Sequence, residues 1–355
     1  MKSLICAALI LSTGAYAADY PPSVEGDARL RDFKFRSGKT LAELRVHYRT
    51  LGQPRRDAAG VVRNAVLIMH GTAGAGNNLL RPEFAGELFG AGQPLDASRY
   101  FIVLPDAIGH GQSSKPSDGL HGGFPRYGYF DLVEASRRLL IETLGVSHLR
   151  LVMGTSQGGM LTWLWGEQHP EFVDALMPLA SLPVQISGRN RAWRRLVIDA
   201  VRGDPEWRDG NYSAQPSSLR TVAEMFFLVS SNPPLRQNEA PTLAAADRVL
   251  DAYVADFVKT HDTTDTLYAI EASYDYDPGR ALEKIRAPLV AVNSADDYVN
   301  PPELGILERE IQRVPRGRAV LIPLGPETRG HGSHTMAKLW KDELVRLLAE
   351  SEPAH

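Results

Sequence analysis

Short apolar runs alternate along this chain with longer segments in which apolar residues recur at helical spacing. Several of the short runs consist of Val, Ile and Leu without interruption, which is typical of strands buried on both faces. We expect strands at 44–48, 66–69, 101–104, 149–153, 175–179, 289–292 and 319–322, and helices at 132–143, 160–168 and 336–348. This alternation predicts an α/β fold, with a mostly parallel central sheet flanked by helices.

One segment interrupts the alternation. Residues 187–278 contain little strand-like sequence, and they are rich in charge and in large apolar residues such as Trp193 and Trp207. We interpret them as a helical lid inserted between two strands, since insertions at the carboxyl edge of a sheet shape the pocket there. The predicted core then comprises 18–186 and 279–355.

The first 17 residues have the pattern of a secretory signal peptide. Lys2 precedes an apolar run at 4–11, and Ala15-Tyr16-Ala17 supplies the small residues of a cleavage site. The run is too short to cross a bilayer, so we expect an exported protein, periplasmic or secreted, without a stable membrane anchor. The single cysteine, Cys6, lies inside this segment, which leaves the mature chain without disulfides or a cysteine nucleophile.

Composition and charge narrow the function classes. The 355 residues are 43% hydrophobic and 23% charged, with a net charge of -3, as in ordinary globular proteins. No basic stripe is present, so we do not expect nucleic-acid binding. The loop Gly71–Gly76 lacks the Gly-Lys-Ser/Thr ending of a phosphate-binding loop, and no group of metal ligands stands out. We therefore predict no cofactor and no metal.

A serine between glycines is the strongest chemical feature. Gly154-Thr155-Ser156-Gln157-Gly158 follows a predicted strand and precedes a predicted helix. This is the G-x-S-x-G pattern of a nucleophile elbow, in which a sharp and strained turn exposes the serine hydroxyl above the sheet. A glycine-rich turn without a catalytic role could have the same sequence pattern. The position between strand and helix favours Ser156 as a nucleophile.

A serine nucleophile requires a base and an acid that orients it, in the chain order serine, acid, histidine. Two neighbouring acids, Asp296 and Asp297, follow a predicted strand, and two histidines, His331 and His334, follow the last one. We prefer Asp297, at the entry to the next loop, and expect Asp296 to be a solvated or capping carboxylate. We prefer His331, and we place His334 at the start of the last helix, capping it or lining the pocket.

Acyl transfer also requires donors for the oxyanion. His70-Gly71-Thr72 follows an early strand, and the backbone N–H of Thr72 can point into the site. The N–H of Gln157 lies at a helix N-terminus, where it is free to bind an anion. We predict that these two groups form the oxyanion hole, with His70 bracing the loop.

With these motifs in place, the chain resembles the α/β-hydrolase superfamily, and within it the homoserine O-acetyltransferase-like branch. The segments "LRVHYRTLG", "VLIMHGTAG", "VLPDAIGHGQSSKP", "FDLVEASRRLLIETLGVSHLRLVMGTSQGGM", "AWRRLVIDAVRGDPEWRDGNY", "DDYVNPPE" and "RGHGSH" carry the resemblance. By position, it implies Ser156, Asp297 and His331 as the catalytic residues. It also implies a possible homodimer formed through the lid.

The chain departs from that branch at three places. Phe130 stands where the transferases carry Arg, and Gly332 follows His331 where they carry Asp. The lid arginine that binds the substrate carboxylate in the branch has no secure counterpart, although Arg191, Arg194 and Arg195 lie nearby. Together with the predicted export, these departures favour hydrolysis over acetyl transfer.

The sequence thus predicts an exported serine hydrolase that cleaves a small-molecule ester or other acyl substrate through an acyl-enzyme. An acyltransferase of the homoserine O-acetyltransferase type would share the first half of this reaction and replace water with another acceptor. A non-catalytic binding protein on the same fold is the third hypothesis, since fold alone does not guarantee chemistry.

The predicted signal peptide is directly testable. Expression of the full chain in a bacterium with an intact secretion system should yield an exported protein that begins at Ala18, because the small residues before it form the cleavage site. Mass spectrometry of the intact exported protein measures this end. An exported protein that retains Met1 would contradict the prediction.

Overall fold

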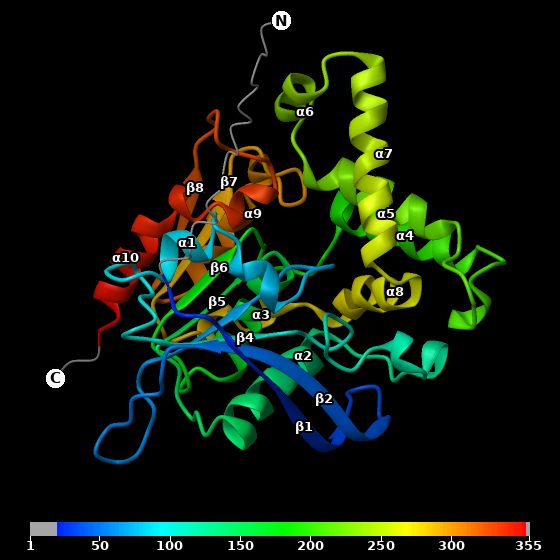
Figure 1. Cartoon of the computed structure of the whole chain (residues 1–355). Coiled ribbons are helices and arrows are strands. Elements are labelled where there is room, and N and C mark those ends of the chain that lie inside the picture. Colours follow the sequence, from blue (N-terminus) through cyan, green and yellow to red (C-terminus); the bar gives the residue numbers. More distant parts are fainter. Residues whose placement is uncertain (1–19, 353–355) are drawn as a thin grey trace, which may run out of the picture.

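A sheet of eight strands lies at the centre of the protein in this computed structural model, which describes residues 20–352 (Figure 1). The strand order is β1-β2-β4-β3-β5-β6-β7-β8; β1 and β2 are antiparallel to their neighbours, and β3 to β8 run parallel. The strands are β1 (Val24–Lys34), β2 (Thr40–Leu51), β3 (Ala65–Met69), β4 (Phe101–Pro105), β5 (Leu151–Thr155), β6 (Leu176–Leu179), β7 (Leu289–Ser294) and β8 (Gly317–Ile322).

The central strands are buried on both faces, as their unbroken apolar runs predict. Alternate residues of β3 enter opposite cores: Leu67 and Met69 pack on one side of the sheet, and Val66 and Ile68 on the other. Side chains alternate in this way along every strand because the backbone is pleated. Burial on both sides therefore requires apolar residues at every position.

Helices cover the two faces of the sheet. The first core contains the large side chains of α3 (Gln157–Gln168), such as Trp163, beside those of α2 (Tyr129–Arg138). The second core contains residues of α1 (Ala85–Leu88) and of α10 (Lys341–Glu350). A short helix, α9 (Ile306–Glu310), lies between β7 and β8 in the chain. The predicted fold class is confirmed.

Five further helices form an insert between β6 and β7, which we call the helical insert (188–271). They are α4 (Gly188–Arg202), α5 (Ser218–Ser230), α6 (Pro233–Glu239), α7 (Leu243–Thr260) and α8 (Thr263–Glu271), all on one side of the sheet (Figure 1). The insert has its own apolar core, which includes Trp193, Trp207 and Phe257. Within residues 20–352, no helix combines the length and the apolar character that crossing a membrane requires.

Several element bounds shift by a few residues from the expectations, and three differences are larger. Strand β1 was not predicted, because its outer face is exposed and only Ala28, Leu30 and Phe33 give it a buried side. Helix α3 starts directly after Ser156 rather than at Met160. The last helix begins at Lys341, since short 3₁₀ turns occupy most of the preceding segment. The predicted signal peptide lies outside the described residues.

Candidate active site

Ser156 occupies a sharp turn between β5 and α3. Its backbone has φ 54° and ψ -110°, a conformation that non-glycine residues adopt only when the surroundings enforce it. A Cβ on Gly158 would lie 2.0 Å from the carbonyl oxygen of Met69, and one on Gly154 would lie 2.3 Å from the backbone of Gly158. Only glycines at these two positions let the helix start this close to the strands. The strain predicted for this turn is therefore present.

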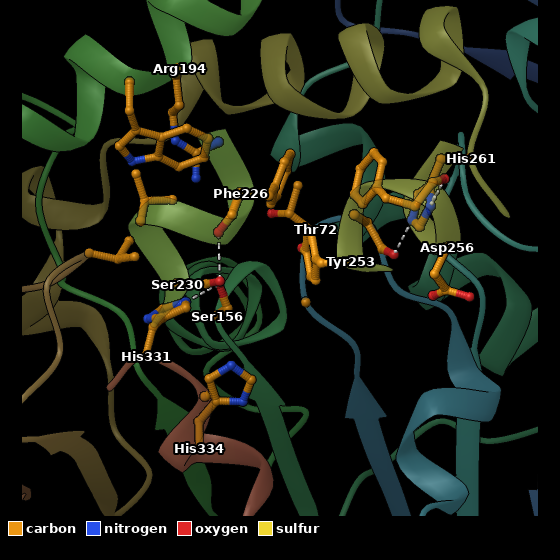
Figure 2. A pocket seen from close by; sticks show the side chains of 17 residues that line it. Thr72, Ser156, Arg194, Phe226, Ser230, Tyr253, Asp256, His261, His331 and His334 are labelled. Atoms are coloured by element: carbon orange, nitrogen blue, oxygen red, sulfur yellow. Dashed lines mark hydrogen bonds between the residues drawn. The ribbon is translucent and has the colours of Figure 1, made fainter. Parts of the chain in front are cut away.

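A chain of hydrogen bonds joins Ser156, His331 and Asp297. The Oγ of Ser156 lies 2.8 Å from Nε2 of His331, and Nδ1 of the same ring lies 2.9 Å and 3.0 Å from the carboxylate oxygens of Asp297. Figure 2 shows Ser156 and His331 facing each other. Because a carboxylate accepts only, Nδ1 carries a proton and Nε2 is free to accept one from the serine.

Asp297 is held as an anion. It is 1% exposed, and its carboxylate accepts hydrogen bonds from the backbone N–H groups of Val299 and Asn300. Burial by itself would raise its pKa, but the charge and hydrogen bond of His331, together with these N–H groups, hold the pKa below its usual value. The carboxylate therefore remains ionised and able to orient the imidazole.

The turn after β3 lies against the serine. A Cβ on Gly71 would lie 3.4 Å from the Cβ of Ser156. His70 braces this turn: Nδ1 lies 2.8 Å from the carbonyl oxygen of Gly71, and Nε2 accepts from the N–H of Ala107 at 3.0 Å. Among the described residues, the backbone N–H groups of Thr72 and Gln157 donate to no acceptor. Both are therefore available to an oxyanion.

Comparison with known proteins agrees with this arrangement. Residues 64–323 match the family described as alpha/beta hydrolase fold. A probable acyltransferase of Methanothermobacter thermautotrophicus is 29% identical over 298 residues, 83% of this chain and 89% of the relative. A homoserine O-acetyltransferase of Trichormus variabilis is 30% identical over 298 residues, 76% of this chain and 79% of the relative.

The chain belongs to the α/β-hydrolase fold family. Within it, this α/β hydrolase is homoserine O-acetyltransferase-like, as the curated relatives indicate. Among solved structures, esterase E22 has a TM-score of 0.80 and 18% identity, with 92% of this chain and 100% of that chain covered. At this identity, the similarity shows the fold.

Asp296 has a structural position that the sequence did not predict. It is 8% exposed rather than solvated, and its carboxylate accepts hydrogen bonds from Ser294, from the side-chain amide of Asn232 and from the N–H of Gly330. Asn232 belongs to the helical insert, and Gly330 directly precedes His331. Asp296 therefore ties the insert to the histidine loop of this α/β hydrolase.

His334 lies beside His331 but outside the hydrogen-bonded chain. It sits in the 3₁₀ turn Gly332–Thr335, not at the start of the last helix as expected. The two rings are 5.1 Å apart and nearly perpendicular (Figure 2). Burial and the neighbouring His331 lower the pKa of His334 to about 3, so this ring stays neutral. It lines the pocket, which was one of the two predicted roles.

The site opens into a hollow of about 310 Å³ between the core and the helical insert, which we call the site hollow. Ser156, Thr72 and His331 lie at its base, and apolar side chains of the insert such as Phe226 and Phe257 form much of its wall (Figure 2). The same wall contains one buried cation, Arg194. Within the described residues, His, Cys, Asp and Glu do not gather in groups of three suited to a metal.

Three residues of the insert reach the site and were not assigned a role from the sequence: Asn232, Arg194 and His261. Asn232 and His261 had no role in the sequence analysis, and Arg194 was one of three neighbouring arginines. The spacing of apolar residues in 187–278 indicates helices, but it does not indicate which face of each helix packs against the core. No local pattern distinguishes these residues from ordinary polar positions.

Substitution can test which of the two neighbouring acids and which of the two histidines act in the reaction. We expect His331→Ala and Asp297→Asn to reduce kcat for an ester substrate by about 10³-fold or more, since both remove members of one unit. His334→Ala and Asp296→Asn should retain far more activity, because neither side chain belongs to the hydrogen-bonded chain that ends at Ser156. Steady-state kinetics with a p-nitrophenyl ester measures the difference, with thermal unfolding as a check on folding. Near-normal turnover by His331→Ala would contradict the assignment.

Proposed function

We propose that this α/β hydrolase transfers acyl groups through an acyl-enzyme on Ser156. The observation that carries the proposal is the hydrogen-bonded chain from Asp297 through His331 to Ser156. In the first step, Nε2 of His331 takes the serine proton while Oγ attacks the acyl carbonyl carbon. The bond to the leaving group then breaks, and His331 returns the proton to the departing oxygen or sulfur.

The negative charge that develops on the carbonyl oxygen needs donors that are already in place. The backbone N–H groups of Thr72 and Gln157 suit this role, because Gln157 follows Ser156 and Thr72 follows Gly71, which packs against the serine. Neither N–H is engaged elsewhere among the described residues. The N–H of Gln157 also lies at the N-terminus of α3, where the helix dipole favours an anion. Asp297 stabilises the imidazolium that forms on His331.

We propose an acceptor other than water for the second step. Curated relatives that cover most of the chain are described as acyltransferases, including homoserine O-acetyltransferases. The acceptor's hydroxyl or amine would lose its proton to His331 and attack the acyl-enzyme, which releases Ser156 and forms the new ester or amide.

The environment of Arg194 favours an acceptor that carries a carboxylate. Its side chain is 2% exposed and lines the site hollow. Its guanidinium donates hydrogen bonds to Asn190 and Ser273, both neutral, and lies over the ring of Trp193. None of the ion pairs found among the described residues includes Arg194. A buried cation is costly without a counter-charge, so an anionic group of the substrate would stabilise it. The planar guanidinium suits a carboxylate in particular.

Hydrolysis of an ester is the second candidate. Ser156 is partly exposed to the site hollow, so water can reach an acyl-enzyme there. Phe130 and Gly332 also stand where the transferase branch carries Arg and Asp. The predicted signal peptide would place the protein outside the cytoplasm, away from acyl-CoA. Water would then be the acceptor in the same second step.

One experiment tests the acyl-enzyme and then separates the two acceptors. We expect the mature protein to cleave p-nitrophenyl acetate or butyrate and Ser156→Ala to lose this activity. Adding homoserine should raise the rate of p-nitrophenol release and produce O-acyl homoserine, detectable by mass spectrometry. Release that homoserine leaves unchanged, with free acid as the only product, would favour hydrolysis. Equal activity of Ser156→Ala would refute the acyl-enzyme.

The role of Arg194 has a matched control on the same helix. Arg194→Gln should weaken the effect of homoserine by about tenfold or more while leaving the effect of an acceptor without a carboxylate, such as ethanolamine, largely unchanged. Arg195→Gln removes an exposed arginine that pairs with Asp199, so it should behave like the wild type. Measurement of product yield against acceptor concentration gives both effects. Identical losses with both acceptors would exclude carboxylate recognition by Arg194.

A further inference from the structure

His261 connects the helical insert to the turn beside the serine. It directly follows α7, and its ring stacks on Phe257 with a centroid separation of 3.9 Å and an interplanar angle of 5°. Its Nε2 lies 3.1 Å from the carbonyl oxygen of Ala73, 188 residues away in the chain. Nδ1 of the same ring lies 2.9 Å from the hydroxyl of Thr260 and 3.0 Å from the carbonyl oxygen of Phe257. In the tautomer in which Thr260 donates to Nδ1, Nε2 carries the proton and donates to the carbonyl of Ala73, which can only accept. Figure 2 shows His261 on the side of the site hollow opposite His331.

The turn that receives this hydrogen bond is strained at Ala73, the residue whose carbonyl accepts it. Ala73 has φ 61°, in the left-handed region, which costs roughly 1–2 kcal/mol for a residue with a Cβ. The carbonyl of Gly71 is held within the core, by His70 and by the N–H of Gly74 at 3.0 Å. The carbonyl of Ala73 is held by His261 alone among the described residues.

This turn carries the N–H of Thr72, one of the two donors assigned to the oxyanion. Thr72 lies between Gly71, which the core holds, and Ala73, which the insert holds. A donor stabilises the transition state only when its N–H already points to the position of the oxyanion, because reorientation during the reaction costs free energy. Loss of the hydrogen bond at Ala73 would let the strained turn relax and move Thr72.

We propose that His261 is a positioning residue, which holds the oxyanion turn in its productive conformation through the carbonyl of Ala73. This inference rests on the acyl-transfer function proposed above. The insert thereby contributes to catalysis as well as to the wall of the site hollow. It contacts the other half of the site through Asn232 and Asp296, next to His331. The helical insert therefore has one hydrogen bond on the side of the base and one on the side of Thr72, one of the two proposed oxyanion donors.

Two substitutions separate the hydrogen bond from the ring stack. His261→Phe keeps an aromatic ring over Phe257 and loses the donor, whereas His261→Gln loses the stack and keeps an N–H near the position of Nε2. We expect His261→Phe to reduce kcat for p-nitrophenyl butyrate about tenfold, with KM within twofold of the wild type. His261→Gln should stay within threefold in kcat. Thr242→Val weakens the cap at the opposite end of α7 and should leave kcat unchanged.

A transition-state analogue provides the specific readout. Binding of a trifluoromethyl ketone, which forms an oxyanion on Ser156, should weaken in His261→Phe by about the same factor as kcat, and recover in His261→Gln. If His261 only packs α7, the order reverses: the glutamine variant is impaired and the phenylalanine variant is normal, which would overturn the inference. Wild-type kinetics in both variants would also overturn it. If a fluorophosphonate fails to label Ser156 in the wild type, the proposed function fails, and this inference fails with it.

Discussion

The close approach between the start of α3 and the ends of β3 and β5 is the constraint on which the site depends. Gly158 lies so near the carbonyl of Met69 that no side chain fits between them. This contact forces Ser156 into its strained conformation and brings the turn after β3 beside it. The serine and the oxyanion turn thus share one edge of the sheet, because parallel strands all end on the same side. The loops after β7 and β8 bring the acid and the histidine to that edge as well.

The helical insert adds hydrogen bonds and a pocket wall to the residues that the core places at the site. The core alone supplies the serine, the histidine, the acid and the two proposed oxyanion donors, but each of the two halves of the site has a hydrogen bond to the insert. Asn232 reaches the carboxylate of Asp296 beside the histidine loop, and His261 reaches the carbonyl of Ala73. The insert also supplies the apolar wall of the site hollow and its buried cation, Arg194. One segment therefore contacts the loop after β7, the turn after β3 and the site hollow.

Arg194 and Asp296 show why neighbouring polar residues differ in role. Asp296 and Asp297 are adjacent in the chain, and both have a lowered pKa. Hydrogen bonds outweigh burial at Asp296, and at Asp297 the charge of His331 acts together with hydrogen bonds. Only Asp297 faces the imidazole, because successive side chains point in different directions. Arg194 and Arg195 are also adjacent, and the first is buried in the hollow while the second pairs with Asp199 at the surface. In each pair, the two side chains leave the backbone in different directions, and only one of them points toward the site.

The sequence by itself determined the α/β class, the nucleophile elbow and the chain order of serine, acid and histidine. These follow from local rules: apolar periodicity, and small residues where the backbone turns sharply. Two choices, Asp297 over Asp296 and His331 over His334, were open in the sequence, and the structure places Asp297 and His331 in the hydrogen-bonded chain. Only the tertiary structure decided that Asn232, Arg194 and His261 reach the site. Each of them has a partner far away in the chain, Asp296 for Asn232, Ser273 for Arg194 and Ala73 for His261. Such contacts depend on how whole elements pack, which no local pattern encodes.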